Sequence, residues 1–360
     1  MKSGFANRIA IVVCLLCTLS GVAGAQPAPR FEVDAGWQPR LPDGWLLGEV
    51  SGIAVDARDH LWVLHRTAGL TAKERGAESG RSHCCIAAPP VLELDPEGRY
   101  VQGWGGPDST PRKLGIAQWP ASEHGIFLDR DGFVWLTGNA PSDGHVLKFD
   151  RAGSFVLQVG ARYAWLGDRS TRYLGRPADI WVDEEHGVAY IADGYRNHRI
   201  VAIDAADGTT LAIWGANGSK PGTRGIRPYN KPVHCVAGRD GLLYVCDRRG
   251  NRVQVFRIAG RAELAYLREI VIAPETAGGG SAWDVTFSPD GARMFVADGE
   301  NERIWVVDPE TGAVTDHFGT GGHHLGQFSW LHSIVADSRG FLYTSEVRGG
   351  RRIQRFRPVP

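Results

Sequence analysis

Short apolar segments alternate with polar turns along most of the chain, from about residue 50 to residue 356. Each repeat contains an apolar segment, a turn of the Asp-Gly kind and three further short apolar segments, as in Asp129–Gly132 followed by Phe133–Leu136. Short apolar runs bounded by such turns predict β-strands joined as hairpins. Because the period is about 50 residues, the repeats predict a propeller, and the pattern requires no helix.

Six copies of this repeat predict an all-β fold with one six-bladed β-propeller domain over residues 26–360. The blades are expected near residues 50–104, 123–160, 177–215, 233–272, 282–319, and 331–356 together with 31–35. The last repeat reaches only its third strand, near Arg352 to Phe356, before the chain stops. The strand-like segment Phe31–Asp34 can supply the fourth. Closure of the ring by this N-terminal strand would remove the free sheet edges.

One register position is shared by the first strand of every repeat. It is occupied in turn by Ser51, His124, Ala178, His234, Trp283 and His332. Histidine therefore stands in every second repeat, and in a closed ring the three imidazoles would lie about 120° apart around the axis. A single histidine at a strand end is most often a hydrogen-bonded structural residue. Three at alternate positions instead predict a metal site, with zinc as the metal, because three imidazoles leave one zinc coordination position open.

The repeats between the histidine repeats offer polar side chains where their second strands end. These side chains are Arg66, Tyr195 and Glu300. Arginine can hold a carboxylate through two hydrogen bonds, and a tyrosine beside a dication and an arginine can accept a proton. Taken singly, Arg66 also fits a surface ion pair and Tyr195 a packed ring. Beside three histidines they predict a catalytic pair acting on a small-molecule or peptide substrate at the mouth of the channel.

The charge balance argues against nucleic acid as a partner. Lys and Arg total 40, Asp and Glu total 40, and the formal net charge is zero. Such a chain has no overall basic field to hold phosphates. The local pairs Arg248-Arg249 and Arg351-Arg352 lie beside turns and are expected to be solvated strand ends. The chain also lacks a Gly-x-Ser-x-Gly elbow, a phosphate-binding P-loop and a dinucleotide-binding fingerprint.

The first 25 residues have the layout of a cleavable secretory signal. Lys2 and Arg8 precede an apolar run, and Ala23-Gly24-Ala25 provides small residues before the expected cleavage point. The apolar run is too short to span a bilayer. We therefore expect a secreted or periplasmic protein that has no membrane segment once the signal is cleaved.

Four cysteines follow the signal segment, and export would permit disulfides between them. Cys235 and Cys246 flank one turn symmetrically, so they can form a bridge across a hairpin or be two small reduced core residues. The neighbours Cys84 and Cys85 can form a strained ring or stay reduced. They lie in a long excursion, residues 67–90, that we expect to act as a lid beside the channel mouth.

The chain resembles the NHL-repeat six-bladed propellers and, among them, the peptidyl-α-hydroxyglycine α-amidating lyases. The residues that support the resemblance are Val50–Asp56, His65-Arg66, His124-Gly125, Pro177–Ile180, Asp193–Tyr195, Asn197, Arg199-Ile200, His234 and Leu331–Val335. The resemblance implies an exported, metal-dependent lyase that cleaves a carbon–nitrogen bond and releases an amide and glyoxylate. It implies that His124, His234 and His332 bind zinc, while Arg66 and Tyr195 serve the substrate and the proton transfer.

Three positions depart from the family pattern. Ser333 stands where the family has the aspartate of a structural calcium site, which argues against calcium binding here. Trp330 replaces a methionine, and Arg196 replaces a cysteine, so one family disulfide is absent. The fold alone does not fix an activity. The alternatives are a non-catalytic propeller that binds a protein, peptide or glycan partner, and a lactonase-like hydrolase, whose metal ligands would be mainly carboxylates and amides.

Overall fold

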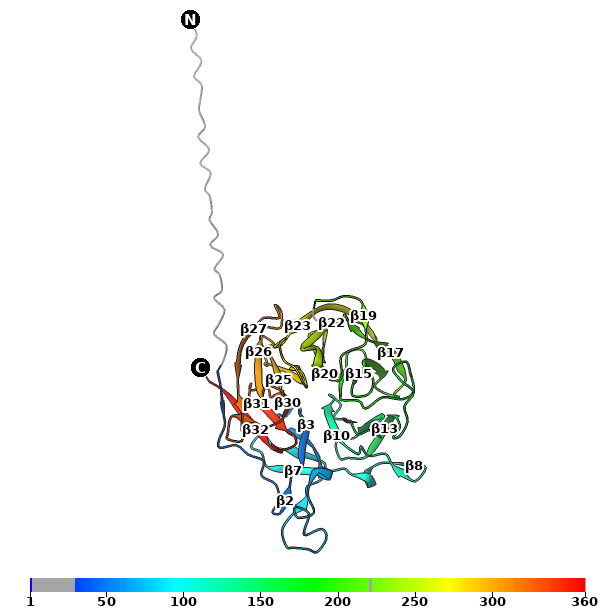
Figure 1. Cartoon of the computed structure of the whole chain (residues 1–360), viewed down its shortest axis with the longest axis vertical. Coiled ribbons are helices and arrows are strands. Elements are labelled where there is room, and N and C mark those ends of the chain that lie inside the picture. The colour runs from blue at the N-terminus through cyan, green and yellow to red at the C-terminus, as the bar shows by residue number, and fades with distance from the viewer. Residues whose placement is uncertain (2–29, 220–221, 360) are drawn as a thin grey trace.

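The computed structural model describes residues 1, 30–219 and 222–359, so the expected signal segment lies almost wholly outside the described residues. The described chain folds into six four-stranded antiparallel sheets arranged around a central axis (Figure 1). The only helical elements in these ranges are three short 3-10 turns, η1 (Thr67–Gly69), η2 (Pro107–Ser109) and η3 (Arg248–Gly250). The predicted all-β, six-bladed propeller is therefore confirmed. No helix in the described part is long and apolar enough to cross a membrane.

Each blade begins with an inner strand at the axis and continues outward in chain order. The first blade comprises β3 (Glu49–Val55), β4 (Leu61–Arg66), β6 (Val91–Leu94) and β7 (Tyr100–Trp104). The second comprises β10 (Glu123–Leu128), β11 (Val134–Gly138), β12 (His145–Phe149) and β13 (Phe155–Gly160). The third comprises β14 (Asp179–Asp183), β15 (Val188–Asp193), β16 (Arg199–Asp204) and β17 (Thr210–Trp214).

The second half of the chain repeats this arrangement. The fourth blade comprises β20 (Val233–Arg239), β21 (Leu242–Asp247), β22 (Arg252–Gly260) and β23 (Glu263–Val271). The fifth comprises β24 (Asp284–Phe287), β25 (Met294–Asp298), β26 (Arg303–Val307) and β27 (Val314–Phe318). The sixth sheet has the order β30 (Leu331–Ala336), β31 (Leu342–Glu346), β32 (Ile353–Val359) and β1 (Arg30–Val33), with β1 antiparallel to β32.

Four short two-stranded sheets lie outside the six blades. They are β2 (Trp45–Leu46) with β5 (Ile86–Ala87), β8 (Arg112–Lys113) with β9 (Ile116–Ala117), β18 (Ala216–Asn217) with β19 (Ile226–Arg227), and β28 (Thr320–Gly321) with β29 (Gln327–Phe328). Three of the four lie in the loops that join one blade to the next. Because each blade ends at the face where the next inner strand begins, these interblade loops surround the end of the axis that carries the histidines.

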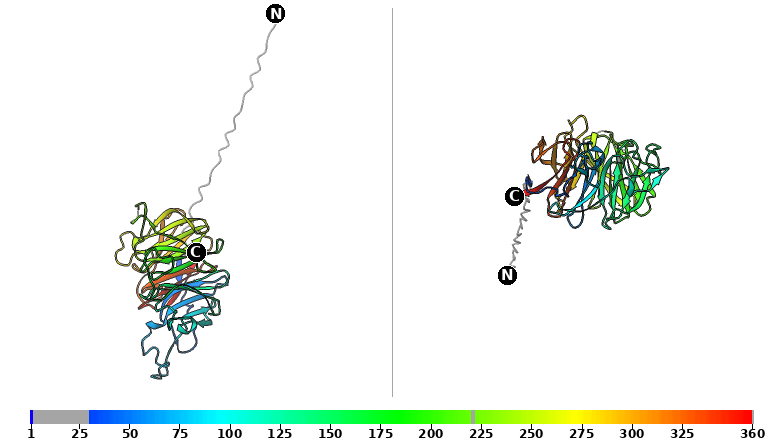
Figure 2. Two further views of the ribbon diagram at one scale, coloured as in Figure 1. Left: turned by 90° about the vertical axis from the view of Figure 1, so that its right-hand side faces the viewer. Right: turned by 90° about the horizontal axis from the view of Figure 1, so that it is seen from below.

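The hydrophobic core is divided among the interfaces between blades. Six buried clusters combine residues of two adjacent blades each, including one between the first and sixth blades that contains Val63 and Tyr343. Because both faces of every blade pack against a neighbour, the middle strands are buried along their whole length, as in β11 and β15. The ring therefore holds its inner strands rigidly, and residues at the start of those strands have fixed positions around the axis. Figure 2 shows this single body from two sides.

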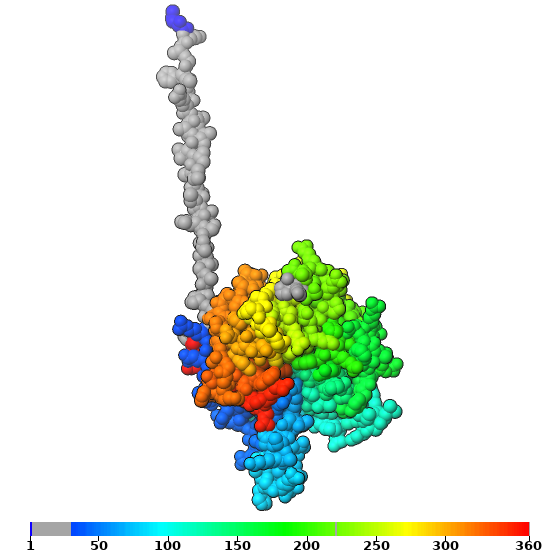
Figure 3. All heavy atoms as spheres, in the orientation of Figure 1, coloured from blue at the N-terminus to red at the C-terminus, as the bar shows by residue number. Residues whose placement is uncertain are grey.

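The long excursion leaves the ring instead of covering it. Residues 67–90 project outward beyond the first blade in the view down the ring, and the space-filling view shows the same protrusion (Figures 1 and 3). Its base is held by an ion pair between Glu74 and Arg351, with 2.7 Å between Oε1 and Nη2. The expectation of a lid over the mouth is therefore wrong, since the excursion lies outside the ring and its β5 pairs with β2, which precedes the first blade.

Both cysteine pairs are joined as disulfides. Cys84 is linked to Cys85 in the excursion, and Cys235 on β20 is linked to Cys246 on β21. The Cα atoms of Cys235 and Cys246 are 4.9 Å apart, which is within the usual range for a bridge. This second bridge ties β20, the strand that carries His234, to its neighbour in the same blade.

Candidate metal centre and its rim

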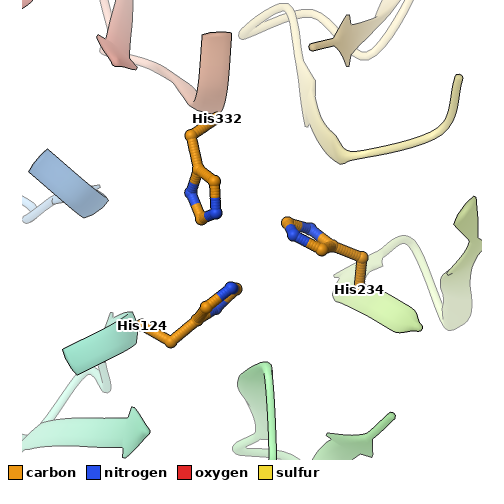
Figure 4. A group of neighbouring side chains, drawn as sticks. All are labelled: His124, His234 and His332. Carbon is orange, nitrogen blue, oxygen red and sulfur yellow. The ribbon is translucent and has the colours of Figure 1, made fainter. Parts of the chain in front are cut away.

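The three predicted histidines meet on the axis of the ring. His124 is on β10, His234 on β20 and His332 on β30, and all three side chains point inward (Figure 4). The ring centroids are 4.7 to 5.0 Å apart, and one nitrogen from each imidazole lies within 4.8 Å of the other two. All three side chains are buried. The structure therefore brings together three nitrogen donors that are remote in sequence.

The blades between the histidine blades fix the orientation of the imidazoles. His124 Nδ1 lies 2.8 Å from the carbonyl oxygen of Ala178, and His234 Nδ1 lies 2.6 Å from that of Trp283. A carbonyl can only accept, so Nδ1 carries the proton and Nε2 keeps its lone pair. The backbone of Ser51 raises the pKa of His332, but Nδ1 of His332 has no hydrogen-bond partner among the described residues. Such carbonyls are the usual partners of metal-binding histidines.

The donor set fits a zinc ion. The Nε2 atom of His234 is buried and has no hydrogen-bond partner among the described residues. Burial lowers the pKa of His124, His234 and His332 well below the ordinary value, and the charge of Arg66 adds to this effect on all three. They are therefore neutral, which is the form that binds metal. Three neutral imidazoles with no carboxylate among them match a zinc centre that keeps one position open.

Tyr195 lies directly beside this centre, where the sequence predicts it. Its hydroxyl oxygen is 2.9 Å from Nε2 of His124, and the two ring centroids are 4.9 Å apart. The half-buried ring also faces two arginines. The guanidinium carbon of Arg176 is 5.5 Å from the ring centroid, and that of Arg248 is 6.0 Å from it. The tyrosine hydroxyl is therefore placed between an axial imidazole and positive charge.

Arg66 also faces the centre but is already engaged by the protein. Its Nε donates to the carbonyl oxygen of Glu123 at 2.8 Å, and its Nη1 forms an ion pair with Glu49 at 2.7 Å. Its charge acts on all three histidines, as their lowered pKa values show. Arg66 is therefore close to the centre, with two of its three nitrogens committed to groups of the first two blades.

Arg248 contradicts the sequence-based expectation of a solvated strand end. Its side chain is buried. Burial lowers the pKa of the guanidinium, and the interaction with Tyr195, which raises the pKa, offsets only part of this effect. The turn η3 directs Arg248 inward, where Nε donates to the carbonyl oxygen of Gly279 at 2.8 Å and the guanidinium stacks on Trp283. Arg249 next to it remains exposed. No local sequence signal reveals the burial of Arg248, since Trp283 lies 35 positions further along the chain (283 − 248).

The other Arg pair is less solvated than its turn position suggests, and Glu300, which the sequence predicts at the mouth with Arg66 and Tyr195, is exposed instead. Arg351 and Arg352 are half-buried and ion-paired with Glu74 and Glu346. Glu300 does not face the histidines, because its Oε2 accepts a hydrogen bond from the backbone N–H of Gly279 at 2.9 Å. It orders the loop that holds Arg248 instead of contributing to the metal centre.

A narrow channel continues from the histidines into the ring. Its cavity of about 250 Å³ is lined by the three histidines and by two carboxyl side chains, Asp179 and Asp284. Ser333, the residue that replaces the family's aspartate, donates to Asp284 Oδ2 at 2.6 Å. Burial raises the pKa of both carboxyls, that of Asp284 to about 6. The sequence did not single out either aspartate, because an isolated Asp after the first strand position resembles a turn residue.

A second group of possible ligands lies on the first blade and is better explained as an ion-pair network. Asp56, His60 and Glu93 approach within 4.8 Å of one another. Arg58 forms an ion pair with Glu93 at 2.9 Å, and Arg151 forms ion pairs with both Asp56 and Glu93. These guanidinium groups already neutralise the two carboxylates, so a metal ion is not needed to balance their charge.

Fold and centre together define a six-bladed β-propeller with a three-histidine centre on its axis. The chain is 26% identical to peptidylglycine alpha-amidating monooxygenase of Rattus norvegicus over 338 residues, which cover 89% of this chain and 32% of that protein. It is 26% identical to NHL repeat-containing protein 3 of Mus musculus over 92% of this chain and 85% of that protein. With peptidyl-alpha-hydroxyglycine alpha-amidating lyase 2 of Drosophila melanogaster it shares 24% identity over 89% and 74% of the two chains.

These proteins are the homologues of the chain, which is thus a propeller related to the amidating enzymes and to NHL repeat-containing protein 3. The chain spans about a third of the length of the rat monooxygenase, 32%. No family model matches it. A crystal structure of a protein of unknown function from Bacteroides thetaiotaomicron superposes with a TM-score of 0.53 at 14% identity, over 92% of this chain and 76% of the other, which supports the fold alone.

Proposed function

We propose that the chain is an exported, metal-dependent lyase that cleaves the carbon–nitrogen bond of an α-hydroxyglycine compound and releases an amide and glyoxylate. The observation that supports this most strongly is the meeting of three neutral imidazoles with the Tyr195 hydroxyl and the Arg248 guanidinium at one mouth of the ring. The lyases of Drosophila melanogaster and Caenorhabditis elegans among the relatives favour the same reaction. Export is proposed from the signal-like residues 1–25.

His124, His234 and His332 would hold the metal through Nε2, since the backbone carbonyls of the neighbouring blades engage or face Nδ1. Zinc, when bound there, supplies a Lewis acid that stabilises negative charge developing on a hydroxyl oxygen. The surrounding burial excludes water from the three imidazoles and strengthens electrostatic interactions within the centre.

Tyr195 would move the proton. Its oxygen, 2.9 Å from His124 Nε2, is placed to take the proton of the substrate hydroxyl group when Tyr195 is present as the phenolate, the form to which it returns at the end of the reaction. The electron pair of that O–H bond then forms the carbonyl of glyoxylate as the C–N bond breaks. The departing nitrogen keeps the C–N electron pair and receives the proton from Tyr195, which yields the amide. Atoms and charge balance without any oxidant or further reactant.

Two arginines would orient the substrate. Arg248 faces Tyr195 and presents a planar guanidinium, which matches a carboxylate through two parallel hydrogen bonds. Arg66 has two nitrogens engaged by Glu123 and Glu49, so its main contribution would be positive charge near the reacting oxygen. We therefore assign carboxylate binding chiefly to Arg248 and not to Arg66.

The reaction can be tested with purified mature protein loaded with zinc and N-benzoyl-α-hydroxyglycine as the substrate. Glyoxylate and benzamide are expected in equal amounts. The variant His317→Ala is a suitable control, because His317 is an exposed residue of the outer strand β27 and should leave turnover unchanged. A protein that binds zinc at the three histidines but releases no glyoxylate would contradict the proposed reaction.

A second candidate function is a non-catalytic propeller that binds a protein, peptide or glycan. The similarity to NHL repeat-containing protein 3 favours it, because the match covers 85% of that protein, whereas it covers 32% of the rat monooxygenase. In that case a metal at the histidines would only stiffen the ring. Zinc retention without turnover toward any α-hydroxyglycine compound would support this candidate.

A further inference from the structure

Trp283 makes two separate contributions to the rim of the centre. Its backbone carbonyl accepts the hydrogen bond of His234 Nδ1 at 2.6 Å, and its buried indole ring lies 4.1 Å from the guanidinium carbon of Arg248. The indole is itself fixed, because Nε1 donates to the carbonyl oxygen of Gly280 at 2.6 Å. One residue therefore connects the metal-binding side of the mouth with the arginine side.

A glycine loop completes the seat of Arg248. The carbonyl oxygen of Gly279 accepts from Arg248 Nε at 2.8 Å, and the N–H of the same residue donates to Glu300 at 2.9 Å. A Cβ atom at Gly280 would lie 2.0 Å from the carbonyl oxygen of Arg248, and Gly280 has a φ of +79°. No other residue type fits this close approach without displacing the backbone. The loop and the indole thus restrain the guanidinium from two sides.

We propose that Trp283 is a positioning residue, which holds Arg248 in the orientation that binds a substrate carboxylate and so makes the site selective for compounds with a free carboxylate. This inference rests on the proposed function of the site. An unsupported arginine loses much rotamer freedom when it binds a ligand, and stacking on an indole removes that freedom beforehand. A cation–π contact with a buried tryptophan also offsets part of the desolvation of the buried guanidinium.

The side chain and the backbone of Trp283 can be separated experimentally. The hydrogen bond from His234 uses the backbone carbonyl, which remains when the side chain is replaced. The indole also packs on the imidazoles of His234 and His332, with ring centroids 5.4 and 5.9 Å apart, so the zinc content of each variant is measured as well. The replacement Trp283→Leu should therefore keep zinc and lose the stacking, whereas Trp283→Phe keeps an aromatic face. If Trp283→Leu does not fold, Trp283→Phe still reports on the loss of the Nε1 hydrogen bond to Gly280.

The test is calorimetric titration of the zinc-loaded mature protein with N-acetylglycine and with its neutral counterpart N-acetylglycinamide. We expect Trp283→Leu to bind N-acetylglycine about tenfold more weakly, with Trp283→Phe in between, on the scale of one buried cation–π contact. Binding of the amide should not change. In a protein that already carries Arg248→Ala, Trp283→Leu should cause no further loss, because the tryptophan acts through the arginine.

Trp305, in the fifth blade, provides a matched control. The guanidinium carbon of Arg303 lies 5.3 Å from the centroid of its ring, and the pair lies away from the three histidines. The replacement Trp305→Leu should leave carboxylate binding unchanged. Equal binding of N-acetylglycine by wild type and Trp283→Leu, or additive losses with Arg248→Ala, would overturn the inference. Absence of turnover in a wild type that still discriminates the two probes would instead contradict only the proposed reaction.

Discussion

The hydroxyl oxygen of Tyr195 lies 2.9 Å from Nε2 of His124, although the two residues are 71 positions apart and belong to neighbouring blades. The contact arises because Tyr195 follows the second strand of the third blade, whereas His124 lies on the first strand of the second blade. A candidate proton acceptor thereby touches a candidate metal ligand without any intervening group. The propeller supplies this proximity through its closed geometry, because adjacent blades meet at the axis.

Tyr195→Phe is expected to lower kcat by about 10² to 10⁴-fold, the usual contribution of a positioned acid–base group. The zinc content should stay at the wild-type level, because the three imidazoles are retained. Tyr163→Phe is a suitable control, since Tyr163 is exposed. Turnover by Tyr195→Phe at the wild-type rate, measured as glyoxylate release, would rule out the role of this hydroxyl group.

Arg66→Ala should destabilise the fold as well as reduce activity, because it leaves Glu49 without its partner at 2.7 Å. Since both side chains are only partly buried, the expected decrease in the free energy of unfolding is about 1–2 kcal/mol. The double replacement Arg66→Ala with Glu49→Ala should recover part of this stability but not the activity. Denaturant titrations and glyoxylate assays of the same preparations separate the two effects. Full recovery of activity in the double variant would show that Arg66 acts only through the ion pair.

The carboxyl groups in the channel should make stability depend on pH. Burial raises the pKa of Asp284 to about 6, so the folded protein holds this proton more tightly than the unfolded chain. This contribution to stability is full below the ordinary carboxyl pKa and is lost as the pH rises through about 6. Asp284→Asn should therefore gain stability relative to wild type as the pH rises, by about 3 kcal/mol at pH 8.

Thermal unfolding at pH 4, 6 and 8 in the presence of EDTA measures this difference without a contribution from zinc release. Ser333 Oγ donates a hydrogen bond to the carboxyl of Asp284. The variant Ser333→Ala removes this hydrogen bond but keeps the carboxyl, so it serves as a control. A stability difference between Asp284→Asn and wild type that is the same at all three pH values would contradict the raised pKa.

The bridge between Cys235 and Cys246 should stabilise the fourth blade. Replacement of both cysteines by alanine is expected to lower the free energy of unfolding by about 2–4 kcal/mol, as is typical when a disulfide that closes a chain loop is lost. Replacement of both Cys84 and Cys85 should have little effect, because adjacent residues close no loop of the unfolded chain. Equal unfolding midpoints for the Cys235/Cys246 variant and the wild type would contradict a stabilising bridge.

The sequence predicts the ring and its three axial histidines because both depend on a repeated register. The alternation of His124, His234 and His332 with Ser51, Ala178 and Trp283 is visible without coordinates, and the structure explains it, since the intervening residues present backbone carbonyls to the imidazoles. Periodicity does not encode contacts between different loops. The position of Arg248 depends on Gly279 and Trp283 of the next blade, so one arginine of an Arg-Arg turn that looks solvated is in fact buried.

Glu123 illustrates the same limit. It precedes His124 at the start of β10, where a glutamate would ordinarily be solvated, yet burial raises its pKa to about 7 and Trp119 Nε1 donates to its carboxyl at 2.7 Å. The outward course of residues 67–90 could not be predicted either, because the parallel pairing of β2 with β5 joins two two-residue segments with no periodic signal. Only the structure therefore reveals which distant residues contact these short segments.

The central claim is that alternate blades bind one zinc ion through three imidazoles. The most direct test is the zinc content of the purified mature protein and of His234→Ala, measured by atomic emission after dialysis against a weak chelator, with His317→Ala as the control. One zinc per chain in the wild type and in the control, with loss of zinc from His234→Ala, is the predicted result. Wild-type protein without zinc, or His234→Ala that retains a full equivalent, would contradict the account.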